Sequence, residues 1–138
     1  MSEPRVYWDS SALIAVCEDE SVSALFWGRS DGVARSHAFA EMFSTLTGGR
    51  LGYRLKSDDA AKLIGEIAGH LKVEDLLGGE LLKVLSEARE RGVRGGQVHD
   101  LVHAAAAIKA SCSCLVTYNV RDFEGLYEEL EIEKPESL

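Results

Sequence analysis

The chain has 138 residues, of which 46% are hydrophobic and only two are proline, so it can bury the core of one domain. No apolar run approaches the ~20 residues of a membrane-spanning helix, and the N-terminal Met-Ser-Glu-Pro-Arg lacks the pattern of a signal peptide; we therefore expect a cytoplasmic protein with no membrane partner. The formal net charge of −8 is unusual for a nucleic-acid-binding protein, because phosphate binding depends largely on Lys and Arg.

Strand and helix patterns alternate along the chain without a repeat or a linker, which predicts a single domain over residues 1–138. The expected strands are Arg5–Trp8, Val33–Ser36, the ambiguous Leu71–Leu77, Cys114–Thr117 and Glu131–Glu133. The expected helices are Ala12–Cys17, Ser21–Trp27, His37–Leu46, Ser57–Leu71, Glu80–Arg91, Asp100–Ala110 and Val120–Glu129. This alternation predicts an α/β fold with a short, mainly parallel sheet that is well covered by helices.

Two of the expected helices have apolar residues at spacings of three and four, which predicts the face that each turns to the core. In the expected helix His37–Leu46, these residues are Phe39, Met42, Phe43 and Leu46. In the expected helix Glu80–Arg91, they are Leu81, Leu82, Leu85 and Ala88.

Acidic and amide side chains stand where the expected strands end and helices begin. Asp9 directly follows the first strand, and Asn119 and Asp122 follow the fourth strand. Asp100 opens a helix, and Glu41 lies on the polar side of another. Sites in parallel sheets form beyond the carboxyl ends of the strands, so these groups would converge if the first and fourth strands are neighbours. Taken singly, each aspartate is equally well explained as a helix cap, and Glu41 is better explained as a solvated side chain.

Clustered carboxylates in a small α/β domain suit a hard cation, because Mg²⁺ and Mn²⁺ prefer oxygen ligands. Such ions can activate water and stabilise the oxygens of a phosphodiester displacement. The chain has no competing Ser/His/Asp or Cys/His arrangement and no phosphate-binding G-x-x-x-x-G-K-[ST] motif.

Four segments of the sequence resemble the PIN domain family and, within it, the VapC-type toxins of VapBC toxin–antitoxin pairs. Val6–Ile14 is similar to the opening strand with its first acid, and Phe39–Met42 to the segment with the second. Val98–Ala107 is similar to the helix of the third acid, and Leu115–Phe123 to the segment with the fourth polar position. The resemblance extends to Pro135 and implies a three-layer α/β/α fold with a PIN-type nuclease activity.

The resemblance also implies an endoribonuclease that uses Mg²⁺ or Mn²⁺, forms a homodimer and is inhibited by an antitoxin protein. Asp9, Asp100 and Asp122 would hold metal, and Glu41 would bind metal through water or orient the attacking water. The implied supporting residues are Ser10, Thr117 and Asn119. Many relatives have an acid where Asn119 stands, so either Asn119 or Asp122 supplies the fourth position. The alternatives to a toxin are a PIN-fold nuclease in RNA processing and an inactive PIN-fold binding module.

Cysteines, histidines and arginines leave further alternatives. Cys112 and Cys114 are expected to be small buried residues rather than half of a metal site, because no second Cys/His pair lies at useful spacing. His99 and His103 flank Asp100, and we favour packing or RNA contact over metal ligation for them. Arginines concentrated near the site would offset the acidic charge; the candidates are Arg5, Arg29, Arg35, Arg50, Arg54, Arg89, Arg91, Arg94 and Arg121.

Overall fold

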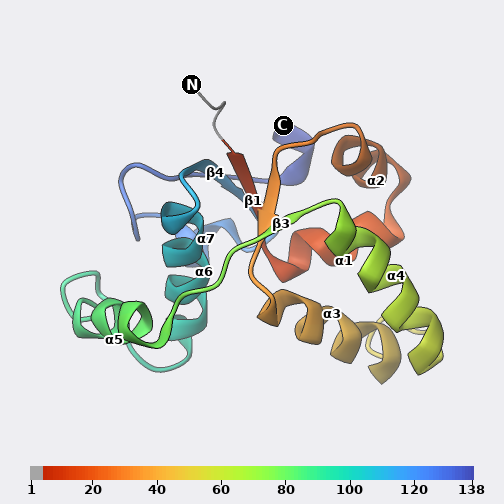
Figure 1. Cartoon of the computed structure of the whole chain (residues 1–138), viewed down its shortest axis with the longest axis horizontal. Helices are drawn as coiled ribbons and strands as arrows, with labels where there is room; N and C mark the ends of the chain where they lie inside the picture. The colour runs from red at the N-terminus through yellow and green to blue at the C-terminus, as the bar shows by residue number, and fades with distance from the viewer. Residues whose placement is uncertain (1–4) are drawn as a thin grey trace.

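The computed structural model describes residues 5–138; residues 1–4, which hold most of the N-terminal segment considered above for a signal peptide, lie outside the described residues. Within residues 5–138, five strands form one sheet in the order β3-β2-β1-β4-β5, and every neighbouring pair is parallel (Figure 1). The strands are β1 Arg5–Trp8, β2 Gly32–Ala34, β3 Lys72–Val73, β4 Cys112–Val116 and β5 Glu131–Glu133. The predicted short parallel sheet is therefore confirmed.

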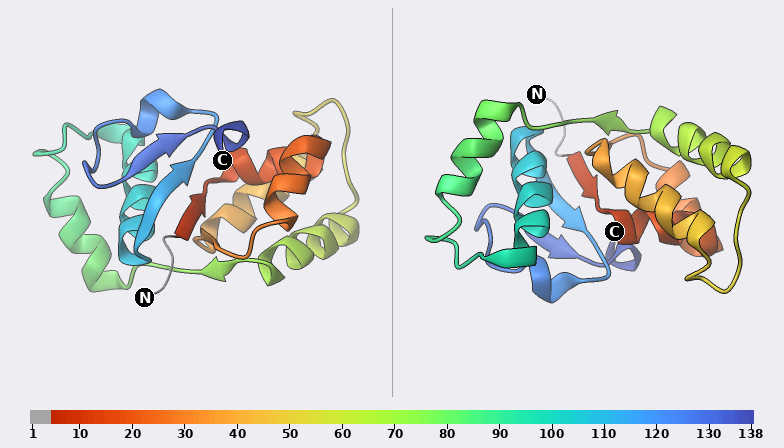
Figure 2. Two further views of the ribbon diagram at one scale, coloured as in Figure 1. Left: turned by 90° about the horizontal axis from the view of Figure 1, so that it is seen from above. Right: turned by 90° about the horizontal axis from the view of Figure 1, so that it is seen from below.

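Helices connect successive strands and cover both faces of the sheet. The α-helices are α1 Ser10–Glu18, α2 Glu20–Trp27, α3 His37–Gly48, α4 Ser57–Gly69, α5 Gly78–Ser86, α6 Val98–Lys109 and α7 Val120–Phe123. Short 3₁₀ turns, Gly95–Gln97 and Pro135–Ser137, precede α6 and end the chain. In Figure 1, α1 to α4 lie on one side of the strands and α5 to α7 on the other, and the two views of Figure 2 show the same separation.

Two buried clusters, one on each face of the sheet, make this a three-layer α/β/α fold. Trp8, Phe26 and Met42 belong to the cluster beneath α1 to α4, whereas Tyr7 and Phe123 belong to the cluster beneath α6 and α7. Successive side chains of a strand point to opposite faces, so neighbouring residues of β1 serve different clusters. Both faces of β1 are consequently buried, as expected for a central parallel strand.

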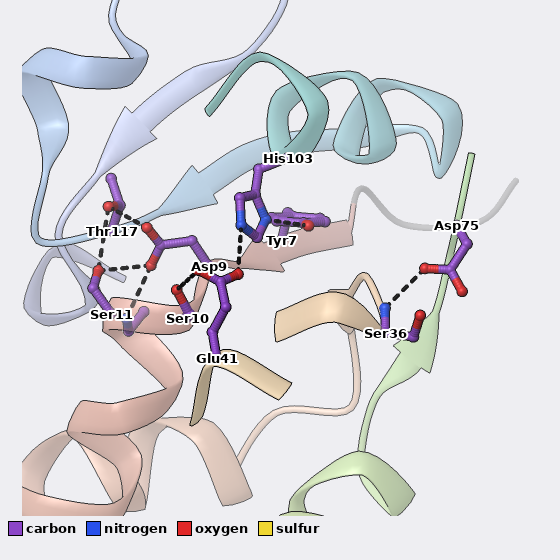
Figure 3. A network of polar contacts seen from close by, with 10 residues as sticks. Tyr7, Asp9, Ser10, Ser11, Ser36, Glu41, Asp75, His103 and Thr117 are labelled. Atoms are coloured by element: carbon purple, nitrogen blue, oxygen red, sulfur yellow. Dashed lines mark hydrogen bonds and ion pairs between the residues drawn. The ribbon is translucent and has the colours of Figure 1, made fainter. Parts of the chain in front are cut away.

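Beta strands β1 and β4 lie side by side, which satisfies the condition set for a site at their carboxyl ends. Trp8 pairs with Val116 in the parallel ladder, and the backbone N–H of Asp9 donates to the carbonyl of Val116 at 3.2 Å. Asp9 and Thr117, the residues that follow each strand, are therefore brought together at one edge of the sheet (Figure 3).

Helix α6 packs against β4 through a run of small side chains. Every residue from Leu101 to Ala107 is buried, including four consecutive alanines. Alanine has a high helix propensity and adds little bulk, so the helix axis can lie close to the sheet. Asp100 lies in the first turn of this helix, which begins at Val98 rather than at Asp100 as expected.

The apolar faces predicted for α3 and α5 were partly wrong. Met42 and Leu46 are fully buried, but Phe43 is exposed because α3 turns a narrower stripe, completed by Ala38, toward the core. In α5 no residue is buried, and Leu82 and Leu85 are 68% and 41% exposed. Helix α5 packs against α6, and its Val84 is partly buried against the cluster beneath α6 and α7, whereas Leu82 and Leu85 lie on the outer side of the helix.

Several predicted helix limits also need correction. Helix α2 begins at Glu20, not at Ser21, because Asp19 caps it by accepting from the backbone N–H of Ser21 at 2.9 Å. Helix α5 ends at Ser86 rather than at Arg91, and α7 is a single turn that ends at Phe123 rather than at Glu129. Helix α3 begins at His37 as expected but ends at Gly48 rather than at Leu46. Gly49 follows it with φ 88°, a left-handed conformation that glycine adopts without strain.

The cysteines fit the expectation of small buried residues. Cys112 and Cys114 are buried on β4, and in residues 5–138 all three cysteines are free thiols. Burial raises the pKa of each of these two thiols to about 12. Across the described part of the chain, no helix has the length and apolar character required to cross a membrane.

Candidate active site

Asp9 is the buried centre of the candidate site and also the N-cap of α1. Its Oδ1 accepts hydrogen bonds from the Ser11 hydroxyl at 2.7 Å and from the backbone N–H of Ala12 at 2.9 Å. Its Oδ2 accepts from the Thr117 hydroxyl at 2.6 Å (Figure 3). Burial raises the pKa of Asp9, and these three hydrogen bonds oppose that rise. The capping explanation considered for Asp9 is correct, but it leaves lone pairs on a side chain that is only 4% exposed.

Thr117 and Ser11 join Asp9 to the loop that follows β4. The Thr117 hydroxyl accepts from the backbone N–H of Asn119 at 2.9 Å while it donates to Asp9. The Ser11 hydroxyl accepts from the backbone N–H of Tyr118 at 3.0 Å while it donates to Asp9. The carboxylate and the loop are thus held to each other by two hydroxyl bridges, which supports the positioning role expected for Thr117.

Glu41 extends from α3 toward α6 and is held by side chains from both sides. The Ser10 hydroxyl donates to its Oε2 at 3.4 Å, and Nε2 of His103 lies 3.4 Å from its Oε1 (Figure 3). The His103 ring holds the pKa of Glu41 below its usual range, although partial burial opposes this. Ser10 therefore contacts Glu41 rather than Asp9, and Glu41 is not a freely solvated side chain of α3.

His103 is buried and is oriented by Tyr7 from the opposite side. The Tyr7 hydroxyl lies 2.7 Å from Nδ1 of His103, and the two rings pack edge to face at 5.7 Å. Burial raises the pKa of Tyr7 well above its usual value, so its hydroxyl keeps its proton and can donate to Nδ1. We accordingly place a hydrogen on Nε2 of His103, the ring nitrogen that faces Glu41. With 4% exposure, His103 has the packing role expected for it and no surface for RNA contact.

Asp100 and Asp122 approach the site from α6 and α7. Burial raises the pKa of Asp100, and the negative charges of Asp122 and Asp9 raise it further. Asp122 and Asp9 therefore both lie within electrostatic range of Asp100. Asp122 is exposed and lies on the outer rim, and Asn119, the residue at the N-cap position of α7, makes no capping hydrogen bond through its side chain.

The donor set fits a hard cation in its chemistry, although the carboxylates do not form a closed cage. Within residues 5–138, no three His, Cys, Asp or Glu side chains stand together as a ready set of metal ligands. The available donors are nevertheless oxygens, and the buried Oε1 of Glu41 has no hydrogen bond beyond its 3.4 Å ion-pair contact with Nε2 of His103. Mg²⁺ commonly uses one or two carboxylates and completes its octahedron with water, so a cage of three is not required.

Sequence reasoning missed two parts of this arrangement. Ser11 bridges Asp9 to the Tyr118 backbone, whereas the supporting residues expected from the sequence were Ser10, Thr117 and Asn119. A serine two residues after an N-cap aspartate is the available signal, because it lies in the first turn beside the capping carboxylate. Tyr7 was treated as a strand residue, and its contact with His103 spans 96 positions, so no local pattern could reveal it.

Of the candidate arginines, two are held in ion pairs and two line hollows that include residues of the site. Arg29 pairs with Asp31 at 2.8 Å, and Arg91 pairs with Glu87 at 3.6 Å, both away from the site. Arg50 lines a hollow that also includes Ser10 and Glu41. Arginine 121 lines a second hollow that includes Asp122. Local positive charge near the site thus comes from separate residues at its margins.

The three-layer arrangement, with Asp9 at the carboxyl end of the central parallel strand, is a PIN-like α/β/α fold. Comparison of the sequence with protein-family models and with curated proteins found no match. Solved structures do match over nearly the whole chain. PAE2754 from Pyrobaculum aerophilum has a TM-score of 0.68 and 21% identity, covering 94% of this chain and 89% of that one.

Two further solved structures have the same fold. VapBC-1 from nontypeable Haemophilus influenzae has a TM-score of 0.66 and 15% identity, covering 95% of this chain and 98% of that one. FitAcB from Neisseria gonorrhoeae has a TM-score of 0.63 and 17% identity, covering 96% of this chain and 99% of that one. At these identities the similarity shows a shared fold.

Proposed function

We propose that this chain is a metal-dependent endoribonuclease that acts as the toxin of a type II toxin–antitoxin pair. The observation that carries the proposal is the buried Asp9 carboxylate at the carboxyl ends of β1 and β4, which Ser11 and Thr117 hold in one orientation. The shared fold with VapBC-1 supports the toxin assignment, because VapBC is the toxin–antitoxin type that the sequence resembles.

In the proposed mechanism, Asp9 and Asp100 hold Mg²⁺ or Mn²⁺ and Asp122 contributes from the rim. The bound ion would supply positive charge at the carboxylates and polarise the phosphodiester. Ser11 and Thr117 keep the Asp9 carboxylate in one orientation by donating to both of its oxygens. Glu41, held between the Ser10 hydroxyl and Nε2 of His103, would orient the attacking water, and the His103 ring favours its ionised form.

The proposed protein partners are an antitoxin and a second copy of this chain. VapBC-1 and FitAcB carry the names of two-component assemblies, and both share this fold. Exposed leucines on and beside α5, Leu77 and Leu82 at 69% and 68%, provide an apolar surface of the kind that marks protein contacts. Light scattering of the purified protein would test the dimer, and a mass equal to one chain at all concentrations would contradict it.

The central experiment is cleavage of total cellular RNA by the purified protein with Mg²⁺, with Mn²⁺ and with EDTA. The Asp9→Asn/Asp100→Asn double variant removes two proposed ligands without a change in side-chain shape, so it should lose cleavage. Asp58→Asn/Asp59→Asn is the matched control, because it makes the same charge change at exposed positions of α4. Circular dichroism would show that each variant keeps its fold.

Discrete fragments that require metal, persist in the control and vanish in the double variant would support the nuclease. Cleavage by purified Asp9→Asn/Asp100→Asn at the rate of the native chain would refute the assigned site. Absence of cleavage with every metal would favour an inactive binding module. If the protein cleaves RNA but its gene has no neighbouring antitoxin gene, a role in RNA processing would be favoured over a role as a toxin.

Metal binding can be measured without activity. Millimolar Mg²⁺ or Mn²⁺ should raise the melting temperature, because an ion that binds only the folded state stabilises it. The rise should be smaller in Asp9→Asn than in the native chain. Equal melting temperatures with and without either ion would contradict a metal site formed by these carboxylates.

A further inference from the structure

Two surface hollows meet at the loop residues Tyr118 and Asn119. One hollow, of about 580 Å³, lies between α1 and α3 and is lined by Ser10, Glu41 and, at its margin, Arg50. The other, of about 570 Å³, lies beside α7 and has Arg121 and Lys134 in its lining. Both hollows include Tyr118 and Asn119, so these two residues form a ridge between them, which we call the Tyr118 ridge.

Positive side chains stand on both sides of the Tyr118 ridge. Within residues 5–138, Arg50, Arg121 and Lys134 make no hydrogen bond or ion pair through their side chains. Their charges are therefore available to a ligand, which is notable in a chain of net charge −8. Carboxylates share the two hollows: Glu18 and Glu41 in the first, and Asp122 and Glu124 in the second. Asp122 is one of the proposed metal ligands, so a bound ion would neutralise its charge.

Tyr118 presents an aromatic ring in a fixed position beside the carboxylates. Its side chain is 36% exposed, and its hydroxyl donates to Glu136 near the end of the chain. Its backbone N–H donates to Ser11, whose hydroxyl in turn donates to Asp9. An exposed ring held at both ends loses little conformational freedom on binding, which suits a stacking surface.

We propose that Tyr118 stacks on a nucleobase of single-stranded RNA, with the flanking phosphates in the two hollows beside Arg50 on one side and Arg121 and Lys134 on the other. The proposal rests on the nuclease function proposed above and names the form of its substrate. Stacking needs an accessible base face, which single strands and loops offer and an A-form duplex does not. Cations on both sides of an aromatic ridge match the alternation of phosphate and base along one strand.

The test is the affinity for a short, fluorescein-labelled single-stranded RNA of mixed sequence, measured by anisotropy in EDTA so that no metal-dependent cleavage occurs. Tyr118→Leu should raise the Kd about 5- to 150-fold through the loss of one stacking contact. Tyr118→Phe keeps the ring and loses only the hydroxyl contact with Glu136, so its Kd should rise far less than that of Tyr118→Leu. Arg121→Gln and Lys134→Gln should each reduce the slope of log K against log salt by about 0.7. Lys83→Gln, the same charge change on exposed α5, should alter neither quantity.

Equal RNA affinity of Tyr118→Leu and the native chain would overturn the proposal, as would a native chain without measurable RNA affinity. The same holds if Tyr118→Leu loses binding to a purified antitoxin but not to RNA, because the ridge would then be a protein-binding surface. RNA bound through Tyr118 without metal-dependent cleavage would instead refute only the nuclease function. Cleavage combined with unchanged binding by Tyr118→Leu would refute only the ridge. Thermal unfolding of each variant checks that the fold is kept.

Discussion

The hydroxyl of Thr117 is expected to stabilise the folded chain through its contact with Asp9, and Thr117→Val removes that hydroxyl at nearly constant volume. Thr117 is fully buried, and its hydroxyl donates to Asp9 at 2.6 Å while it accepts from the backbone N–H of Asn119. The substitution leaves Asp9 buried with one donor fewer and the N–H of Asn119 without its partner.

The expected loss follows from the kinds of hydrogen bond involved. A hydrogen bond to a charged group contributes about 1.5–3 kcal/mol. The N–H of Asn119 is on an exposed residue and can be hydrated, so its loss adds little. We therefore expect Thr117→Val to lower the free energy of unfolding by about 2–3 kcal/mol. Thr117→Ser should recover most of that amount, because it restores the hydroxyl and removes only a methyl group.

Urea denaturation at neutral pH measures this difference. Thr47→Val is a suitable control, because its hydroxyl donates only to the carbonyl of Phe43 within α3, and a change within about 0.5 kcal/mol is expected. In the double variant with Asp9→Asn, the cost of Thr117→Val should shrink by about 1 kcal/mol or more, since contacting residues are coupled. If Thr117→Val unfolds at the same urea concentration as the native chain, the reasoning about Asp9 is wrong.

Further outcomes can be checked in the same material. Leu46→Ala, at a fully buried position, should cost about 2–5 kcal/mol of unfolding free energy, whereas Leu82→Ser on the exposed face of α5 should change it by less than about 0.5 kcal/mol. Gly49→Ala should cost about 1–2 kcal/mol, because the backbone there has φ 88°. Cys112 and Cys114 should resist iodoacetamide at pH 8 until the chain is unfolded, as mass spectrometry would show, because burial raises each thiol pKa to about 12.

The fold could be predicted where local patterns also describe the packing. The β-prone run Arg5–Trp8 and the Ala-rich α6 are buried on both sides, so their composition alone indicated their place. Helix α5 shows where such reasoning fails, because Leu82 repeats the helical pattern of a buried residue yet faces outward. Periodicity identifies which residues of a helix share a face, but the contacts that cover that face come from distant parts of the chain.

The site was predictable to the extent that it depends on chain order. Asp9 and Thr117 follow strands that proved to be neighbours, so their meeting followed from the parallel topology. The contacts of Glu41 could not be obtained in this way, because its partners Ser10 and His103 come from two other helices. Their positions depend on how α1, α3 and α6 pack, which no spacing in the sequence records.

An acidic protein can bind RNA if a few cations and one stacking contact act at the same place. Three cations, Arg50, Arg121 and Lys134, stand beside the Tyr118 ridge, so three phosphate contacts would give a slope of log K against log salt of about −2. Stacking by Tyr118 releases no counterions. The ratio of the Kd of Tyr118→Leu to that of the native chain should therefore stay constant as salt rises, whereas the Kd of Arg121→Gln should approach the native value. A slope much steeper than −2 would mean that RNA contacts cations beyond this ridge.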